Sequence, residues 1–183
     1  DTPAATSRWN TCFENLNWKE IFLHCYKTSG DVQLRWFQTR LLHRVLPTQR
    51  YLFLCKIKDS PLCNFCEKDE QSIVHLFFDC DLVSKFWNDL LVLLKEKCNH
   101  CHDIYFDQEL ILFGLKLNVH TDAVLDLIIL MAKFYIYKCK LQDTQPILNT
   151  FTLLLQNRYN IERYIAAVND KTSQFDTTWA PYL

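Results

Sequence analysis

The chain has 183 residues and a formal net charge of −1, and 49% of its residues are hydrophobic and 14% aromatic. This composition excludes a disordered protein, and the length is enough for one domain with a hydrophobic core. Only two glycines and five prolines occur, which favours long helices and argues against a glycine-rich phosphate loop. No apolar run reaches the roughly 18 to 20 residues of a membrane span, so we expect no membrane contact.

Nine cysteines are present, an odd number that does not suggest a small disulfide framework. The N-terminal residues are polar and do not resemble a signal peptide, so metal-bound and buried thiols in a reducing, intracellular compartment are expected. The first residue is Asp1 rather than methionine, which suggests a piece of a longer protein.

Charge is unevenly distributed along the chain. Residues 31–58 contain six Lys or Arg against one Asp, whereas residues 59–109 contain four Lys against eleven Asp or Glu. A chain that is neutral in total can therefore still present a basic face.

Residues 1–16 read as a flexible lead, and residues 17–183 as a single helical domain. Polar residues that precede apolar positions at helical spacing mark where helices start; these are Asn17, Asp31, Thr48, Ser72, Asp81, Asp107 and Thr121. The helix after Thr121 is apolar nearly all round, which predicts a central buried helix. A last long helix is expected over about 147–168, and the tail ends in Trp179 and Tyr182, which are candidates to pack back on the body.

Residues 60–81, which we call the zinc knuckle, contain the pattern C-x2-C-x8-H-x4-C. Cys63, Cys66, His75 and Cys80 can close a tetrahedron around one zinc ion, and four protein ligands leave no open position, so the site would be structural. His75 and Cys80 are five apart, so an ideal helix would separate them, and the helix must loosen before Cys80. The alternative is a set of ordinary buried thiols with a hydrogen-bonded histidine.

A second C-x2-C motif consists of Cys98 and Cys101, with His100 and His102 beside them. It could bind a second ion, replace His75 and Cys80 as ligands of the first ion, or be a polar loop. The acidic segment over 67–70 is expected to be solvated. No activated serine, phosphate loop or His/Asp relay is recognisable, so this chain alone is not expected to be an enzyme.

The basic segment just before the knuckle is the candidate binding surface. Cations pair with phosphates, and exposed aromatic or arginine planes stack on unpaired bases. The candidate contacts are Arg35, Trp36, Arg40, His43, Arg44, Arg50, Lys56 and Lys58. The alternative is a solvated helix face with Trp36 in the core. The buried side of the same helix is expected to consist of Leu34, Phe37, Leu41 and Val45.

Three stretches together resemble a known family: LRWFQTRLLHRVLPTQRYL, KIKDSPLCNFC and HLFFDC followed by FW. They are similar to the zinc-binding region near the C-terminus of reverse transcriptases from LINE-type (non-LTR) retrotransposons, most closely the second open reading frame of the L1-like group. The resemblance implies that Cys63, Cys66, His75 and Cys80 are the family's Cys-Cys-His-Cys zinc ligands. It also implies a non-catalytic C-terminal domain that binds the element's RNA during target-primed reverse transcription. From the helical patterns themselves we expect an all-α domain with the zinc knuckle inserted between helices.

The resemblance further implies polymerase and endonuclease domains upstream, and a place in a cytoplasmic ribonucleoprotein and in the nucleus. Two other roles stay open at this point. The same basic face could recognise target DNA, or the chain could be a protein-docking module that packs against the reverse transcriptase domain, with Trp179 and Tyr182 as anchors.

Overall fold

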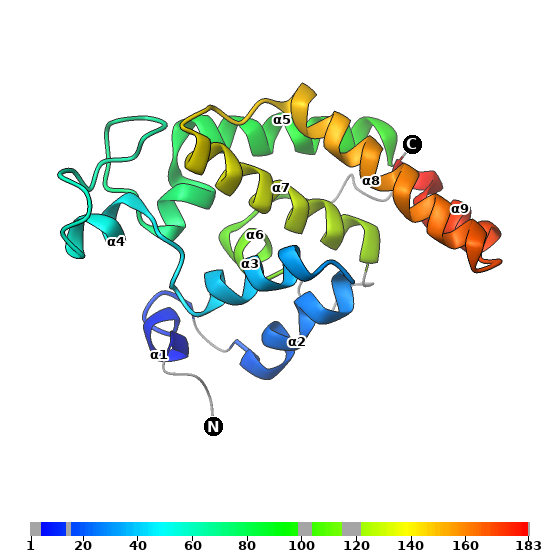
Figure 1. The fold of residues 1–183 in the computed structure, drawn as a ribbon, viewed down its shortest axis with the longest axis horizontal. Coiled ribbons are helices and arrows are strands. Elements are labelled where there is room, and N and C mark those ends of the chain that lie inside the picture. The colour runs from blue at the N-terminus through cyan, green and yellow to red at the C-terminus, as the bar shows by residue number, and fades with distance from the viewer. Residues whose placement is uncertain (1–4, 14–15, 99–103, 115–121, 183) are drawn as a thin grey trace.

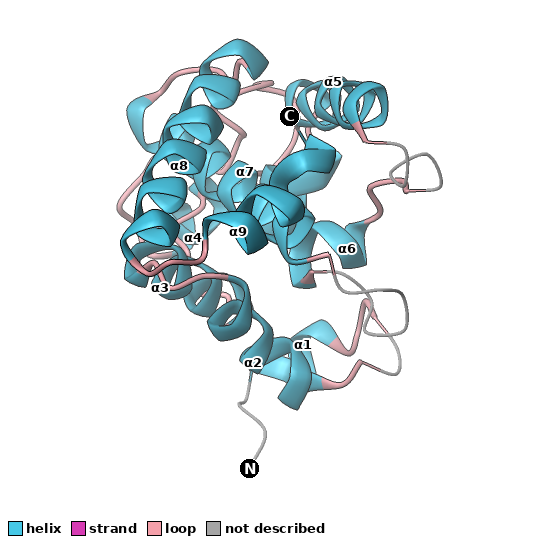
Figure 2. Cartoon of the chain, turned by 90° about the vertical axis from the view of Figure 1, so that its right-hand side faces the viewer, coloured by secondary structure: helices cyan, strands magenta, loops and turns pink. Residues whose placement is uncertain are grey.

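A computed structural model describes residues 5–13, 16–98, 104–114 and 122–182, and in this part the chain is helical with no strand, apart from an isolated bridge between Leu62 and Glu70. The expected all-α class is therefore confirmed (Figures 1 and 2). The helices are α1 (Ala5–Trp9), α2 (Trp18–Thr28), α3 (Val32–Leu42), α4 (Gln49–Leu54), α5 (Asp81–Lys97), α6 (Gln108–Phe113), α7 (Ala123–Gln142), α8 (Leu148–Val168) and α9 (Thr172–Trp179), with a π-helical turn η1 (His75–Asp79) and a 3-10 turn η3 (Ala180–Tyr182).

The helix starts follow the capping residues that the sequence offers. Asn17 accepts a hydrogen bond from the Glu20 amide, Asp31 caps the first turn of α3, and Thr48 accepts from the Tyr51 amide. Asp107 caps α6 in the same way. Helix α7 is capped by Asp122 rather than by the expected Thr121, which lies outside the described residues. Each side-chain oxygen satisfies an amide that has no partner inside the helix.

Helix α7 lies at the centre of the molecule (Figure 1). Its buried residues occur all around the helix, as predicted, because α2, α3, η1 and α8 all pack against it. Phe37 of α3 meets the rings of Phe134 and Tyr137 at centroid distances of 5.4 and 5.6 Å. Such tilted aromatic pairs add to the stabilisation from apolar burial.

Two polar groups of α7 are buried in this core and are paired. Lys133 donates to the side-chain oxygen of Gln38 at 2.7 Å and to the Leu112 carbonyl at 3.2 Å. Asp126 lies 2.9 Å from the His24 ring nitrogen of α2. These bonds join α2, α3 and the end of α6 to the central helix.

The prediction of a flexible lead over 1–16 is wrong for its described part. Residues 5–13 include α1, and both Trp9 and Phe13 are buried in the core. The indole of Trp9 donates to the Leu42 carbonyl at 2.8 Å, and its ring packs edge-on against Phe113. A large aromatic residue in a polar-looking segment is enough to hold it on the body.

Two further expectations are corrected. Asp81 is the first residue of α5 rather than its cap, which is Cys80, and the Asp81 carboxylate instead pairs with Lys68. Val45 is exposed and leaves the inward stripe of α3, although Leu34, Phe37 and Leu41 are buried. The cause is that α3 ends at Leu42 and Arg44 takes a left-handed φ of 57°, which turns the chain away.

Helix α4 and the loop that follows it, residues 49–62, form what we call the arm. The helix ends at Leu54, and Lys56 has a φ of 58°. No residue of α4 is buried. The arm and the knuckle loop lie at one end of the molecule, and the hairpin α8–α9 lies at the other (Figure 1).

The C-terminal tail packs back on the body, as predicted. Trp179 and Tyr182 are buried, and Trp179 stacks with Tyr159 and Phe175. These two residues are therefore part of the fold's own core, and the expectation that they anchor a partner is wrong. Among the described helices, none has the length and apolar character needed to cross a membrane.

Candidate metal centre and nucleic-acid interface

The structure brings together the four residues of the predicted zinc site. One ligand atom from each of Cys63, Cys66, His75 and Cys80 lies within 4.8 Å of all the others. Zinc bonds of about 2.3 Å to sulfur and about 2.0 Å to nitrogen give tetrahedral edges of roughly 3.8 Å for two sulfurs and roughly 3.5 Å for sulfur and nitrogen. The Cys63–Cys80 sulfur pair is separated by 3.9 Å and the Cys66–His75 pair by 3.4 Å. The cluster is therefore compatible with one zinc ion.

The turn that carries Cys63 and Cys66 is closed by backbone hydrogen bonds. The Glu67 amide donates to the Cys63 carbonyl at 2.8 Å, and the Cys63 amide donates to the Asp69 carbonyl at 2.8 Å. The Phe65 amide points at the Cys63 sulfur, 3.4 Å away. Amides aimed at a sulfur stabilise its thiolate form, which is the form that binds metal.

The π-helical turn explains how His75 and Cys80 share one site. Over His75–Asp79 the backbone bonds run five residues apart, and the Cys80 amide donates to the His75 carbonyl at 3.0 Å. This wider turn brings residues five apart into register, whereas an α-helix aligns residues three or four apart. The expected loosening before Cys80 is thus confirmed, and it takes the form of a π-turn.

The surroundings of the two buried sulfurs favour a thiolate. The hydrogen bond between the Cys63 and Cys80 sulfurs lowers the pKa of Cys63 to about 4, and bonds from the Gln71 side chain and the Phe65 amide lower it as well. The same bond, together with burial, raises the pKa of Cys80. Since zinc ligands must be deprotonated, a bound ion takes the place of the proton that the two sulfurs share.

A buried amide beside the ligands was not foreseen. Gln71 donates to the Cys63 sulfur at 3.4 Å and to the Asn64 side-chain oxygen at 2.6 Å. Asn64 in turn donates to the Lys140 carbonyl and to the Asp143 carboxylate at the end of α7. An isolated glutamine after an acidic loop carries no spacing signal, so only the folded structure reveals this network.

Half of the eight predicted nucleic-acid contacts are held by partners within the chain. Arg35 donates to the carbonyls of Ser29 and Tyr26, and the His43 ring lies 5.2 Å from that of Phe22. Arg44 donates to the Arg8 carbonyl at 3.1 Å and its guanidinium lies 4.4 Å from the Trp9 ring centre. Arg50 pairs with Glu70 at 3.4 Å, although both side chains stay about half exposed.

The other half is exposed. Trp36 is 61% exposed, so the alternative that placed it in the core is wrong. Arg40, Lys56 and Lys58 are also exposed, and none of the three side chains makes a hydrogen bond or ion pair with another described residue. Burial lowers the pKa of Lys140 and the nearby charge of Lys58 lowers it further, which indicates that cations gather where the arm meets α7.

Two aromatic residues of the arm are exposed as well. Tyr51 and Phe53 are 44% and 41% exposed, and the sequence interpretation placed no role on either. The sequence signal for their exposure is that so short a helix has no set of apolar residues spaced to face the core. We call the set Trp36, Arg40, Tyr51, Phe53, Lys56 and Lys58 the basic–aromatic surface.

The second cysteine motif is described only in part. Cys98 is buried at the end of α5, and His100, Cys101 and His102 lie outside the described residues. The acidic loop over 67–70 is exposed, as expected.

An all-α domain with a Cys-Cys-His-Cys cluster of this geometry is a zinc-binding domain. Residues 4–87 match a family model described as zinc-binding in reverse transcriptase. The match covers 84 of the 183 residues, less than half the chain, and includes all four ligands. The chain thus contains a zinc-binding region of the kind associated with reverse transcriptases, and the matched region is not a catalytic domain. No curated protein matches the chain.

Proposed function

We propose that this domain binds RNA through the basic–aromatic surface, as the non-catalytic nucleic-acid-binding part of a LINE-type retrotransposon protein. The carrying observation is the exposure of Trp36 beside cations that have no partner among the described residues. The match to a zinc-binding region of reverse transcriptases supports the same assignment. The RNA would be the element's own transcript, positioned for target-primed reverse transcription in a cytoplasmic ribonucleoprotein and later in the nucleus.

The chemistry of the surface favours unpaired nucleotides. Exposed rings stack on bases that are not already stacked in a duplex, and each such contact contributes about 1–3 kcal/mol. Arg40, Lys56 and Lys58 supply charges for phosphates. A duplex offers phosphates but no free base faces, so it would use only half of this surface.

A binding titration tests the proposal. Zinc-loaded protein is titrated with a labelled single-stranded RNA of about 20 nucleotides, and the combined variant Trp36→Ala, Arg40→Ala and Lys58→Ala is compared with wild type. Loss of a stacked ring and two phosphate contacts is expected to weaken binding about 100-fold. It should also reduce the steepness of the salt dependence, because each phosphate contact contributes about 0.7 to its logarithmic slope.

A charge-matched variant, Lys85→Ala with Lys171→Ala, removes two exposed cations from α5 and from the α8–α9 hairpin. It should bind RNA nearly as wild type does. Equal weakening by both variants would show that net charge alone governs binding and would sink the assignment to this surface.

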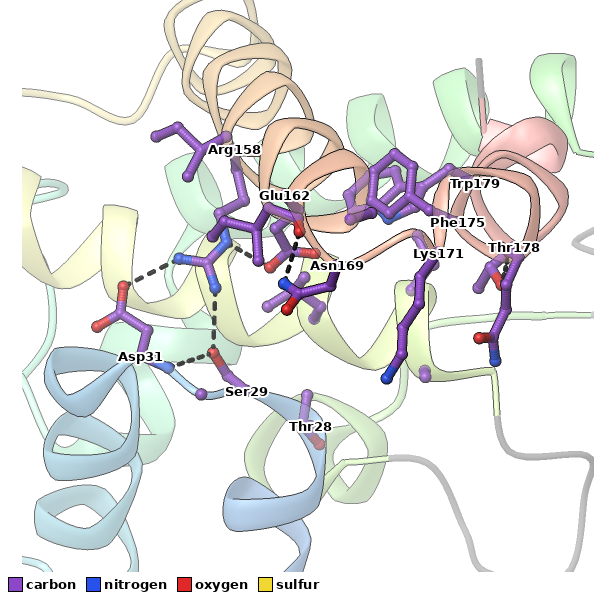
Figure 3. A pocket seen from close by; sticks show the side chains of 18 residues that line it. Thr28, Ser29, Asp31, Arg158, Glu162, Asn169, Lys171, Phe175, Thr178 and Trp179 are labelled. Atoms are coloured by element: carbon purple, nitrogen blue, oxygen red, sulfur yellow. Dashed lines mark hydrogen bonds and ion pairs between the residues drawn. The ribbon is translucent and has the colours of Figure 1, made fainter.

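A second candidate function is docking on the reverse transcriptase domain of the same protein. It is favoured by apolar residues of α8 that remain exposed, namely Ile161, Tyr164, Ile165 and Val168. Ile161 and Ile165 also line a groove of about 860 Å³ between α8, α9 and the α2–α3 connection. Figure 3 shows Arg158 crossing this groove toward Asp31 and Ser29, with Phe175 and Trp179 at its other side.

Docking predicts that Ile161→Ser with Ile165→Ser abolishes association with a separately produced reverse transcriptase domain, measured by calorimetry. Val92→Ser, on the exposed side of α5, is the control and should leave association unchanged. If wild type does not associate, or the double variant associates equally well, this candidate is rejected.

A further inference from the structure

The arm depends on polar contacts for its position. None of the residues of α4 is buried, so the apolar packing that normally orients a helix is absent there. Thr48 caps the helix from its N-terminal side, and the Arg50–Glu70 pair is exposed and worth little by itself. Leu62 at the far end of the arm forms a bridge with Glu70, and the first turn of α4 makes hydrogen bonds to one buried residue.

That residue is Gln71, whose exposed fraction is 0%. Its side-chain oxygen accepts from the Gln49 amide at 3.1 Å, and its backbone carbonyl accepts from the Arg50 amide at 3.4 Å. Its side-chain nitrogen donates to the Cys63 sulfur and to Asn64. One side chain therefore bonds to a zinc ligand at one end and to the first turn of α4 at the other.

Asn64 connects the same network to the body. It donates to the Lys140 carbonyl at 3.2 Å and to the Asp143 side chain at 2.8 Å. Because Asn64 lies in the turn between the ligands Cys63 and Cys66, a metal ion that fixes this turn also fixes the position of its side chain. The chain of contacts runs from α7 through the knuckle to α4.

We infer that Gln71 is a positioning residue that couples the metal site to the arm, so that zinc binding orders α4. With zinc bound, the Cys63 sulfur is a thiolate that keeps accepting the Gln71 bond. Removal of zinc loosens the knuckle, and the first turn of α4 then loses its two bonds to Gln71. The inference rests on the proposed function only for the role of the arm in binding RNA. The positions of Tyr51, Phe53 and Lys56 would depend on zinc, whereas those of Trp36 and Arg40 on α3 would not.

Hydrogen exchange detected by mass spectrometry tests this coupling without RNA. In zinc-loaded protein the arm amides of Leu52, Cys55 and Ile57, which bond to the carbonyls of Thr48, Tyr51 and Leu52, should be protected, and chelation should remove that protection. Gln71→Met keeps the volume, all four ligands and the backbone carbonyl that accepts from Arg50, but it removes the side-chain bonds to the Gln49 amide, to Cys63 and to Asn64. It is expected to keep one zinc per chain and to exchange its arm amides at least about tenfold faster, with amides of α7 unchanged.

A second pair of variants isolates the link to α4 and leaves Gln71 in place. Gln49→Pro removes the amide that donates to Gln71, at the first helical position, where proline is tolerated, and after Thr48, whose ψ of 163° suits a following proline. Gln49→Ala removes the same side chain but keeps the amide. Only the proline variant should speed exchange in the arm.

The coupling is overturned if wild-type arm amides exchange equally with and without zinc. It is also overturned if the arm amides exchange at the same rate in Gln49→Pro and Gln49→Ala, regardless of the zinc content of Gln71→Met. Because no nucleic acid is present, a failure of RNA binding and a failure of this inference are separate results.

Discussion

Two glycines occur in the chain, and the structure gives them different roles. Gly114 has a φ of 102°, and a Cβ placed there would lie 2.7 Å from the His24 ring. Gly30 has open space at the corresponding position and an ordinary φ. Gly114→Ala is therefore expected to cost about 3 kcal/mol, through backbone strain and displacement of the His24–Asp126 pair.

Urea unfolding of zinc-loaded protein measures this difference. Gly30→Ala is the matched control and should stay within about 0.5 kcal/mol of wild type. Equal effects at the two glycines would contradict the described contact between Gly114 and α2.

Lys133 gives a second prediction at the residue scale. Burial lowers its pKa from 10.5 to about 7, against the opposing charges of Asp126 and Cys25. The unfolded chain therefore holds a proton that the folded chain releases, so the free energy of unfolding rises with pH above 7 by about 1.4 kcal/mol per unit. The rise should be clearest between pH 7 and 9, because the raised pKa values of Cys25, Tyr135 and Tyr137 oppose it at higher pH.

Lys133→Met removes this titrating group and should lower the slope over the same window by about 1.4 kcal/mol per unit, leaving the contribution of Cys63, whose pKa is also lowered. Lys138→Met, at an exposed position of the same helix, should keep the wild-type slope. Denaturant midpoints at pH 7, 8 and 9 compare the three proteins, and an unchanged slope in Lys133→Met would assign the effect to other groups.

Some residues of the site can be predicted from the sequence and others cannot. Cys63, Cys66, His75 and Cys80 are predictable because ligand spacing is a local property that a turn and a short helix can satisfy. Gln71 and the Gln38–Lys133 pair are not, because their role depends on which helices meet in space. The exposure of Trp36 was undecided for the same reason: helical spacing places it on a face but does not say what covers that face.

At the scale of the elements, Asp31 joins two helices. One of its carboxylate oxygens caps α3 through the Gln33 amide at 2.8 Å, and the other pairs with Arg158 of α8 at 3.0 Å. Asp31→Ala removes both interactions and is expected to cost about 2 kcal/mol, whereas Asp31→Asn keeps the cap and should cost about 1 kcal/mol.

Arg158→Met removes the ion pair from the other side, together with the bonds of Arg158 to Glu162 and Ser29. Its cost should therefore exceed that of Asp31→Asn, and the double variant should cost no more than Arg158→Met alone. Additive losses in thermal unfolding would contradict a direct pair between α3 and α8.

Helix starts were predictable from the sequence and helix ends were less so. Side-chain caps such as Asn17, Asp31 and Thr48 mark their helices through local chemistry. The ends of α3 and α4 are made by Arg44 and Lys56 in left-handed conformations, and neither residue type signals such a turn. The fold around them selects that conformation.

At the scale of the whole molecule, the zinc knuckle ties the basic end to the central helix. Removal of zinc releases the Asn64 contacts with the end of α7 as well as the ligands. We expect one zinc per chain by elemental analysis and a fall in the unfolding temperature on the order of 10 °C after chelation, since the binding energy of a structural ion is folding energy.

Cys63→Ser should lower the zinc content and the unfolding temperature together. The exposed thiol of Cys12 provides the control, and Cys12→Ser should leave both unchanged. Full zinc content in Cys63→Ser would mean that the ion is bound elsewhere.

The basic–aromatic surface is proposed to bind single-stranded RNA. The most direct test of this proposal is a filter-binding comparison of single-stranded RNA, single-stranded DNA and duplex DNA of equal length with zinc-loaded protein at two salt concentrations. We predict that single-stranded RNA binds at least about tenfold more tightly than the duplex at both concentrations, with an affinity that falls as salt rises. Tightest binding to duplex DNA, or no binding to any of the three, would contradict it.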